Sequence, residues 1–220
     1  MVQPKTLRVI FEKTGKLQYI SHLDLLRTMQ TALRRAKVKM IYSEGFNPHM
    51  KINFALPLSI GIESVCEVMD IRTEGDVDPL EVKTKLAINL PRDMRVLNVY
   101  EAETKLTDIK YAEYGICLDY GEMTEKAAEI AVNIFNGPLV VSKRTKKGER
   151  EVDVQPMIRN IEVKYGYGML VLNCVLCADS ENYLNPFYLT GALDKEMGFE
   201  AHNRKVMRLN ALTADGKRFI

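Results

Sequence analysis

The 220-residue sequence lacks several features that mark particular classes of protein. It has no run of 18 apolar residues and no signal-peptide pattern at its start, so we expect a soluble, cytoplasmic protein without a membrane span. It also contains no phosphate-binding loop, no Ser-His-Asp arrangement and no nucleotide-binding fingerprint. The motifs of the commonest enzyme classes are therefore missing.

Cysteine is scarce, and its four positions do not resemble a disulfide framework. Cys66 and Cys117 stand alone, whereas Cys174 and Cys177 form a single C-x-x-C within an apolar, strand-like segment. Residues three apart on a strand point to opposite faces, so these two thiolates would not converge on a metal ion. We therefore expect this pair to behave as small buried hydrophobes, and we expect no metal site and no cofactor.

Acidic residues are scarce at the start of the chain. Residues 1–51 contain ten Lys and Arg but only three Asp and Glu, a net charge of +7, although the whole chain carries only +2. The remaining 169 residues therefore sum to −5. One strongly basic region is the usual electrostatic sign of an anionic partner.

Hydrophobic periodicity predicts an α+β fold for the first half. Leu7, Val9 and Phe11 alternate on one face of a strand, and Ser21 is a good N-cap for the helix that follows. Further strands are predicted at 37–42, 51–58, 66–73 and 94–100, with a helix that starts at Asp78-Pro79 and ends before Pro91. This order is typical of the ferredoxin-like βαββαβ fold.

The second half repeats this order more loosely. A strand at 110–120 precedes a helix at 123–138, a hairpin around Gly148, further strands at 161–176, a helix that Gly198 ends and a last strand at 204–212. We therefore predict two tandem ferredoxin-like halves, residues 1–104 and 105–220. Each would be an antiparallel sheet with helices on one face.

Two phrases of the first half carry a resemblance to a known family. "RVIFEKTGKLQYISHLDLLRTMQTALRRA" and "YSEGFNPHMKINFALPLSIGIES" resemble a bacterial family of unknown function whose members occur alone or fused to cobalamin-dependent radical SAM proteins. The resemblance implies an accessory domain with a radical SAM protein as its partner, often near genes of RNA maturation. The three-cysteine motif of a radical SAM enzyme is absent here, so radical chemistry would belong to that partner.

A looser similarity of architecture runs to the repeat-associated mysterious proteins of CRISPR systems. Those proteins are tandem ferredoxin-like RNA binders, and some are RNA endonucleases. The similarity implies RNA as a partner here, by analogy of fold.

Two groups of basic residues are candidates for contact with nucleic acid. Arg27, Arg34 and Arg35 share the polar side of the first helix, and guanidinium groups match phosphate oxygens bidentately. A second group, at the tip of the predicted hairpin, contains Lys143, Arg144, Lys146 and Lys147. For both groups the alternative is an ordinary solvated surface.

The loop between the first helix and the strand at 51–58 is unusually rich in functional groups. It offers Tyr42 and Phe46 as stacking surfaces, Asn47 and His49 as hydrogen-bonding groups, and Lys51 as a phosphate partner. If it binds a ligand, Phe46, Asn47 and His49 should face a concavity beside the helix. The alternative is scaffolding, with Phe46 buried as a core anchor.

These observations predict a non-catalytic RNA-binding or accessory module that acts with a radical SAM enzyme. An alternative is a metal-independent RNA endonuclease in which His22 and His49 transfer protons. A third interpretation is a protein-interaction domain that recognises an acidic surface.

Overall fold

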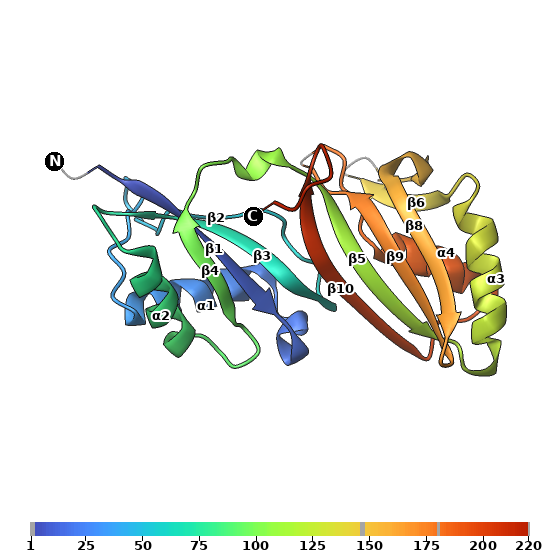
Figure 1. Cartoon of the computed structure of the whole chain (residues 1–220). Coiled ribbons are helices and arrows are strands. Elements are labelled where there is room, and N and C mark those ends of the chain that lie inside the picture. The colour runs from blue at the N-terminus through green and yellow to red at the C-terminus, as the bar shows by residue number, and fades with distance from the viewer. Residues whose placement is uncertain (1–2, 146–147, 180, 220) are drawn as a thin grey trace. The chain divides into compact units, whose positions relative to one another are not determined.

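Two units of similar construction make up the computed structural model, which describes residues 3–145, 148–179 and 181–219 (Figure 1). Unit 1 is Met1–Asp108 and unit 2 is Ile109–Ile220. Within the described residues, each unit contains antiparallel strands and two α-helices. The predicted α+β class is confirmed.

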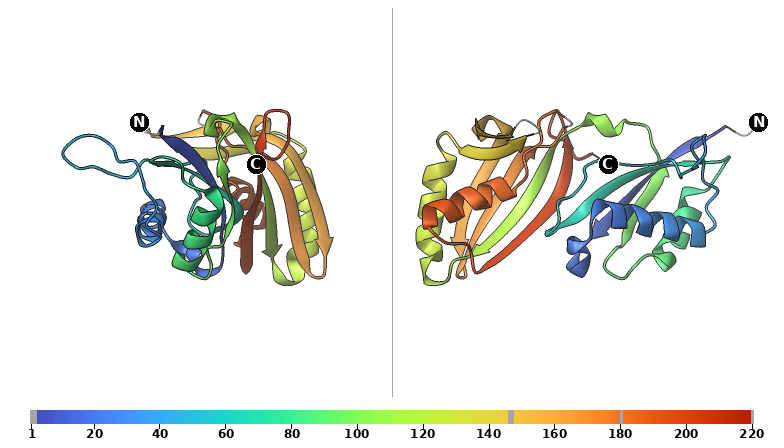
Figure 2. Two further views of the ribbon diagram at one scale, coloured as in Figure 1. Left: turned by 60° about the vertical axis from the view of Figure 1, so that its left-hand side comes forward. Right: turned by 180° about the vertical axis from the view of Figure 1, so that it is seen from behind.

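Unit 1 alternates strands and helices around one antiparallel sheet. Its elements are β1 (Lys5–Lys13), α1 (His22–Arg35), β2 (Ile52–Phe54), β3 (Ile62–Thr73), α2 (Pro79–Asn89) and β4 (Val96–Glu101). The strand order is β4-β1-β3-β2, and each neighbouring pair is antiparallel. Helices α1 and α2 lie side by side on one face of this sheet (Figure 2).

The core of unit 1 lies between that sheet and its helices. Leu7, Val9 and Phe11 alternate along β1 toward the helices, as the sequence predicts, and pack with Met29 of α1 and Leu86 of α2. All five side chains are buried. Removal of these apolar surfaces from water is the main force that holds the layers together.

Unit 2 has the same plan with one insertion. Its elements are β5 (Ile109–Asp119), α3 (Thr124–Phe135), β6 (Val140–Thr145), β7 (Gly148–Asp153), β8 (Ile158–Gly166), β9 (Met169–Cys177), α4 (Phe187–Met197) and β10 (Asn203–Thr213). The strand order β10-β5-β9-β8 corresponds to the order in unit 1, and again each neighbouring pair is antiparallel. Strands β6 and β7 form a separate hairpin inserted between α3 and β8.

Helix boundaries follow the capping residues that the sequence supplies. The Ser21 hydroxyl accepts a hydrogen bond from the backbone N–H of Asp24 at 3.1 Å, and Asp78 accepts one from Leu80 at 3.0 Å. Gly198 ends α4 in the left-handed conformation, with φ of 79°. These three predicted caps are confirmed.

No helix in the described part of the chain is long and apolar enough to cross a lipid bilayer.

The end of α1 differs from the sequence prediction because of one strained residue. Lys37 adopts φ of 53°, a left-handed conformation that costs a residue with a side chain about 1–2 kcal/mol. Its N–H bonds to the Arg34 carbonyl at 3.0 Å, and the N–H of Val38 bonds to the Leu33 carbonyl at 3.1 Å. These two bonds form a Schellman motif, which ends the helix and turns the chain.

The predicted strand at 37–42 is therefore wrong, and the one at 51–58 is too long. Between Lys37 and the start of β2, the only strand-like pairing of the chain consists of isolated bridges, such as that between Met40 and Thr73. Strand β2 is confined to Ile52–Phe54, and Pro57 shortly after it has no N–H to donate to a ladder.

The cysteines remain thiols, and the two of the C-x-x-C do not converge. Cys174 is buried in β9, and burial raises its pKa to about 12. Cys177 lies on the other face of the strand, where its pKa is raised by burial and by Asp179. In the described residues, no three His, Cys, Asp or Glu side chains are grouped to hold a metal ion.

One arginine of unit 1 is completely buried in the sheet. Arg8 of β1 faces Asp70 of β3, and its Nε and Nη2 donate to the two carboxylate oxygens at 2.8 and 2.9 Å. Its guanidinium also donates to the hydroxyl and the carbonyl of Thr104 at 2.6 and 2.7 Å. The exposed fraction of Arg8 is zero, so this charge depends on protein partners alone.

Replacing Asp70 with Ala should lower the free energy of unfolding by about 3–5 kcal/mol, because it leaves a buried guanidinium without its carboxylate. The control is Glu81→Ala, which removes the partner of Lys85 from an ion pair whose two side chains are both exposed, and should cost less than about 1 kcal/mol. Urea unfolding followed by circular dichroism measures both. Equal losses in the two variants would contradict the assigned role of Asp70.

The strain at Lys37 is testable by comparing two substitutions. Lys37→Gly and Lys37→Ala both remove the ammonium group, but only glycine adopts positive φ without cost. We expect the glycine variant to be more stable than the alanine variant by about 1 kcal/mol, measured by thermal unfolding. If alanine is equally stable, the turn relaxes and stores no strain.

Candidate nucleic-acid interface

Helix α1 presents basic side chains to solvent because its opposite face is buried. Leu25, Met29 and Leu33 face the core at intervals of about one turn. The three predicted arginines, Arg27, Arg34 and Arg35, are all exposed on the other side.

A groove of about 520 Å³ beside α1 brings two of these arginines together. Its walls are Arg27, Thr28, Thr31, Ala32 and Arg35 of α1, and Ile88, Asn89, Leu90 and Pro91 at the end of α2. We call this the arginine groove. The eight-residue step from Arg27 to Arg35 corresponds to about 12 Å along the helix axis. No pattern in the sequence predicts the α2 wall, because the two helices are far apart in the chain.

The charges of the arginine groove are only partly compensated. Arg27 forms an exposed ion pair with Asp24 at 3.3 Å, a kind of pair that contributes little stability. The pKa of Asp24 is held below its ordinary value by its hydrogen bond to Ser21 and by the Arg27 charge. Within the described residues, Arg35 has no ion-pair partner. Arg34 lies outside the groove lining, and its Nε donates to the Gln30 carbonyl at 3.2 Å.

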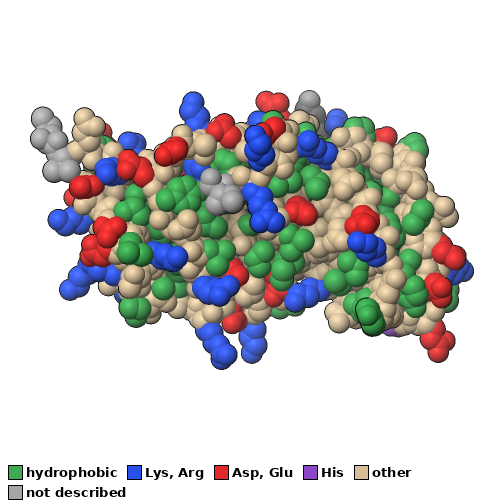
Figure 3. Space-filling view, in the orientation of Figure 1, with side chains coloured by type: hydrophobic (Ala, Val, Ile, Leu, Met, Phe, Trp, Pro, Cys, Tyr) green, Lys and Arg blue, Asp and Glu red, His purple; other side chains and the backbone are tan. Residues whose placement is uncertain are grey.

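Not all of the basic residues of the first 51 positions reach the surface. Arg8 and Lys13 are buried. On the face seen in Figure 3, Lys and Arg side chains are interspersed with Asp and Glu rather than gathered into one patch. The positive charge at the surface is therefore smaller than the sequence count indicates, and Arg27 and Arg35 carry part of it in the arginine groove.

The loop at 42–51 is a projecting hairpin. An isolated bridge joins Tyr42 to Met50, and Ser43 bonds to His49 in three ways: through the two backbones at 2.8 Å, through the His49 N–H and the Ser43 hydroxyl at 3.1 Å, and between that hydroxyl and Nδ1 at 2.8 Å. Figure 2 shows the loop extending away from the helices of unit 1. Ser43, which the sequence analysis did not single out, fixes the base of the hairpin.

The tip of this hairpin contacts solvent rather than a cavity. Phe46 and Asn47 are fully or largely exposed, and Tyr42 is exposed by 44%. The core-anchor alternative for Phe46 is therefore wrong. None of the predicted loop residues, including the half-buried Lys51, lines the arginine groove.

The two candidate histidines have different neighbours. The His22 ring packs edge-on against Phe54, with centroids 5.2 Å apart, whereas His49 bonds to Ser43. In the part of the chain that the structure describes, no hydrogen bond or ring contact links His22 with His49.

The second basic group is only partly described. Lys143 is half-buried, with its Nζ 5.5 Å from the centre of the Tyr188 ring and 3.6 Å from the Met157 sulfur. Burial and the charge of Arg150 lower its pKa. In the backbone ladder of β6 and β7, the position of Arg144 lies opposite that of Glu149, and Lys146 and Lys147 lie outside the described residues. Lys143 therefore packs on its own unit.

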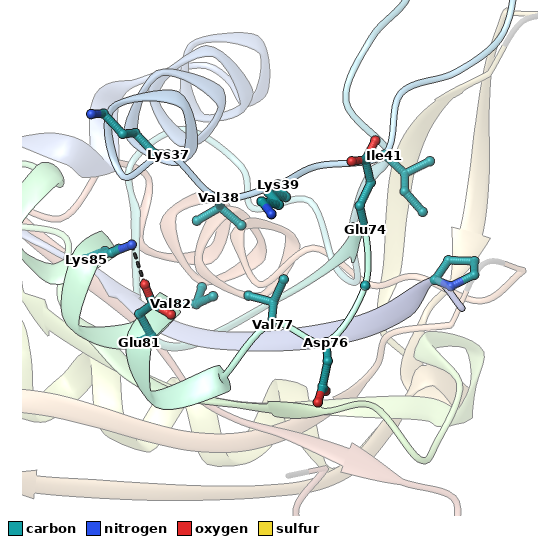
Figure 4. Close-up of a pocket in the computed structure, with 12 residues that line it drawn as sticks. Lys37, Val38, Lys39, Ile41, Glu74, Asp76, Val77, Glu81, Val82 and Lys85 are labelled. Carbon is teal, nitrogen blue, oxygen red and sulfur yellow. Dashed lines mark ion pairs between the residues drawn. The ribbon is translucent and has the colours of Figure 1, made fainter. Parts of the chain in front are cut away.

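A larger cavity of unit 1, of about 850 Å³, was not predicted from the sequence. It lies between the segment after α1 and the start of α2, and Val38, Val77 and Val82 converge on it in Figure 4. We call it the valine cavity. It shares no residue with the arginine groove.

Comparison with known proteins identifies a family but no characterised relative. A family model described as "Uncharacterized protein conserved in bacteria (DUF2344)" matches residues 6–186. No curated protein matches the sequence significantly.

Three solved structures align with most of the chain at low sequence identity. A Cbf5-Nop10-Gar1 complex aligns with 12% identity and a TM-score of 0.49, covering 93% of this chain and 48% of that chain. An archaeal box H/ACA sRNP Nop10-Cbf5 complex aligns with 10% identity and a TM-score of 0.46, covering 93% and 47%. An unknown protein from Galdieria sulphuraria aligns with 10% identity and a TM-score of 0.28, covering 94% and 99%.

The chain spans about half the length of the first two of these structures. At such identities and TM-scores, none of the three supports a functional conclusion. The family match is of a different kind, because it extends through unit 1 and through unit 2 as far as the residue before α4. The chain therefore belongs to the bacterial family of uncharacterized conserved proteins, DUF2344.

Proposed function

We propose that this protein binds RNA through the arginine groove and acts as a non-catalytic module beside a radical SAM protein. The observation that carries the proposal is the convergence of Arg27 and Arg35 on one groove. Guanidinium groups form charge-assisted, bidentate hydrogen bonds to phosphate oxygens. Two guanidinium groups at a fixed spacing on a rigid helix match the regularly spaced phosphates of a nucleic-acid backbone.

The wall opposite the arginines supports a nucleic acid over a simple anion. Ile88 is 79% exposed at the end of α2, and it offers an apolar surface next to two cations. Thr28 and Thr31 add hydroxyl groups between the arginines. Unpaired RNA presents phosphates, 2′-hydroxyls and apolar base faces together, so each wall has a chemical counterpart.

The projecting hairpin supplies a second contact in this proposal. Tyr42 and Phe46 offer exposed rings on which bases stack, with Asn47 and Lys51 as polar partners. The Ser43–His49 hydrogen bonds hold the hairpin's base in place without drawing Phe46 into the core. In this arrangement His49 has a positioning role.

The finer assignments rest on the sequence resemblance and the topology. The resemblance to members that stand alone or are fused to cobalamin-dependent radical SAM proteins supports the proposed partner. The common strand order of the two units supports a tandem ferredoxin-like architecture. The endonuclease alternative needs His22 and His49 to act on one phosphate, and their separate contacts give it no support.

Replacing both Arg27 and Arg35 with Ala should weaken binding to an RNA hairpin with an unpaired loop. Loss of two phosphate contacts should also reduce the slope of log K against log salt by about 1.4, at about 0.7 per contact in single strands. Fluorescence anisotropy over a salt titration measures both quantities.

The matched control is Arg34→Ala, which removes the same charge from the same helix outside the groove. It should weaken binding less than either groove substitution, because Arg34 does not line the groove and acts on the RNA only through a charge that salt screens. The groove is not the RNA site if the double variant binds like the parent, or if Arg34→Ala weakens binding as much as either groove substitution.

The hairpin contact is tested by Phe46→Ala. Because Phe46 is fully exposed, its loss should leave the melting temperature unchanged, whereas loss of one stacked base should weaken RNA binding on the order of tenfold. Phe54→Ala is the control for stability, since Phe54 contacts Phe11 and His22 and its loss should lower the melting temperature. Unchanged affinity in Phe46→Ala would remove the hairpin from the RNA interface.

A further inference from the structure

The valine cavity has an apolar floor in a part of unit 1 that the RNA proposal does not use. Val38 follows α1, Val77 precedes α2, and Val82 is in the first turns of α2. In Figure 4 the three side chains point toward one another beneath a ring of charged residues. Val82 is buried, whereas Val38 and Val77 are half-buried and accessible from the cavity. An apolar body of small-molecule size would find both space and contact there.

Two of the three carboxylates around this floor are already paired. Asp76 accepts a hydrogen bond from Lys5 at 2.8 Å, which holds the pKa of Asp76 below its ordinary value. Glu81 pairs with Lys85 of the next turn of α2 (Figure 4). Lys5 also pairs with Glu101 at 3.3 Å, so Asp76 is partly neutralised, whereas Glu81 has Lys85 as its own partner.

The remaining charges favour an anion. Lys37 and Lys39 line the cavity on the side of α1, and within the described residues neither forms an ion pair. Glu74 is the third remaining charged group of the lining, and it too has no ion-pair partner among the described residues. Two cations against one carboxylate leave a net positive charge above an apolar floor.

The strain at Lys37 is a second, independent observation at the same place. The Schellman motif requires positive φ at the position of Lys37. Glycine usually occupies that position at the end of a helix. Lysine at this position has a strained backbone, and it places an ammonium group at the cavity rim. In Figure 4 this side chain points away from the valines, so it marks the rim and Lys39 lies nearer to the floor. Strained residues of this kind are concentrated at ligand sites.

We propose that the valine cavity binds a small organic anion, with an aromatic or branched aliphatic body on the valines and its charged group on Lys39, while Lys37 adds positive charge at the rim. Glu74 limits the affinity for a simple monoanion, because it lines the same cavity with the opposite charge. The site is separate from the arginine groove, so each ligand binds without the other.

Two dyes of similar shape test this proposal. 8-Anilinonaphthalene-1-sulfonate carries a sulfonate, and N-phenyl-1-naphthylamine is its uncharged counterpart. With the parent protein the sulfonate dye should bind at a single saturable site, at least fivefold more tightly than the neutral dye. Fluorescence titration measures both affinities, and thermal unfolding confirms that every variant is folded.

Substitutions at the rim should separate the charged from the apolar contribution. Lys37→Ala combined with Lys39→Ala should weaken the sulfonate dye at least tenfold and leave the neutral dye within twofold. Glu74→Gln should tighten the sulfonate dye about two- to fivefold. Val77→Asp should weaken the sulfonate dye strongly, since it places a carboxylate in the floor. If that variant does not fold, the rim variants decide, because Lys37, Lys39 and Glu74 are all exposed.

The controls locate the dye. Lys126→Ala removes an exposed lysine of α3 in unit 2, and Arg27→Ala with Arg35→Ala empties the arginine groove of charge. Neither should change the affinity of the sulfonate dye more than twofold. The proposal is overturned if the double lysine variant binds the sulfonate dye like the parent, or if the controls weaken it equally. Failure of RNA binding has no bearing on this result, since the two sites share no residue.

Discussion

A charge with no access to water constrains unit 1 more than any other single group. The guanidinium of Arg8 must find all of its acceptors inside the protein, and Asp70 and Thr104 provide them. The bidentate bond to Asp70 fixes the register of β1 against β3, because a shift of one residue would put the two side chains on opposite faces of the sheet. The bonds to Thr104 also fix the path of the chain after β4.

This constraint has a consequence for how the basic residues are used. Arg8 contributes to the charge excess of the sequence but only to the interior of the structure. Arg27 and Arg35 of α1 are the opposite case, since among the described residues Arg27 pairs only with the exposed Asp24 and Arg35 forms no ion pair. Arginine therefore has two roles: on β1 it forms buried hydrogen bonds, and on α1 it is an exposed hydrogen-bond donor. Burial, not charge count, distinguishes the two roles.

Sequence reasoning succeeded where a local signal determines the structure. Ser21, Asp78 and Gly198 marked helix ends correctly because a cap depends on a few neighbouring residues. Alternation on β1 was equally local. The predicted strand at 37–42 was wrong, because nothing in the local sequence indicates that Lys37 adopts positive φ.

The candidate site was predictable only in part, for a related reason. The arginine face follows from helical periodicity, but the groove needs the end of α2, and no pattern in the sequence links Arg35 to Ile88. The loop at 42–51 was recognisable by its composition. Its projection into solvent was not, since that depends on the pairing of Ser43 with His49. The valine cavity likewise joins segments that are about forty residues apart.

The β6–β7 hairpin is attached to unit 2 without being part of its main sheet. Its two strands pair with each other, so no register of the sheet β10-β5-β9-β8 depends on their length. The entropic cost of closing a longer loop at this position rises only slowly with the number of residues. A change in the length of the turn that joins β6 to β7 should therefore leave the pairing of the main sheet of unit 2 unchanged.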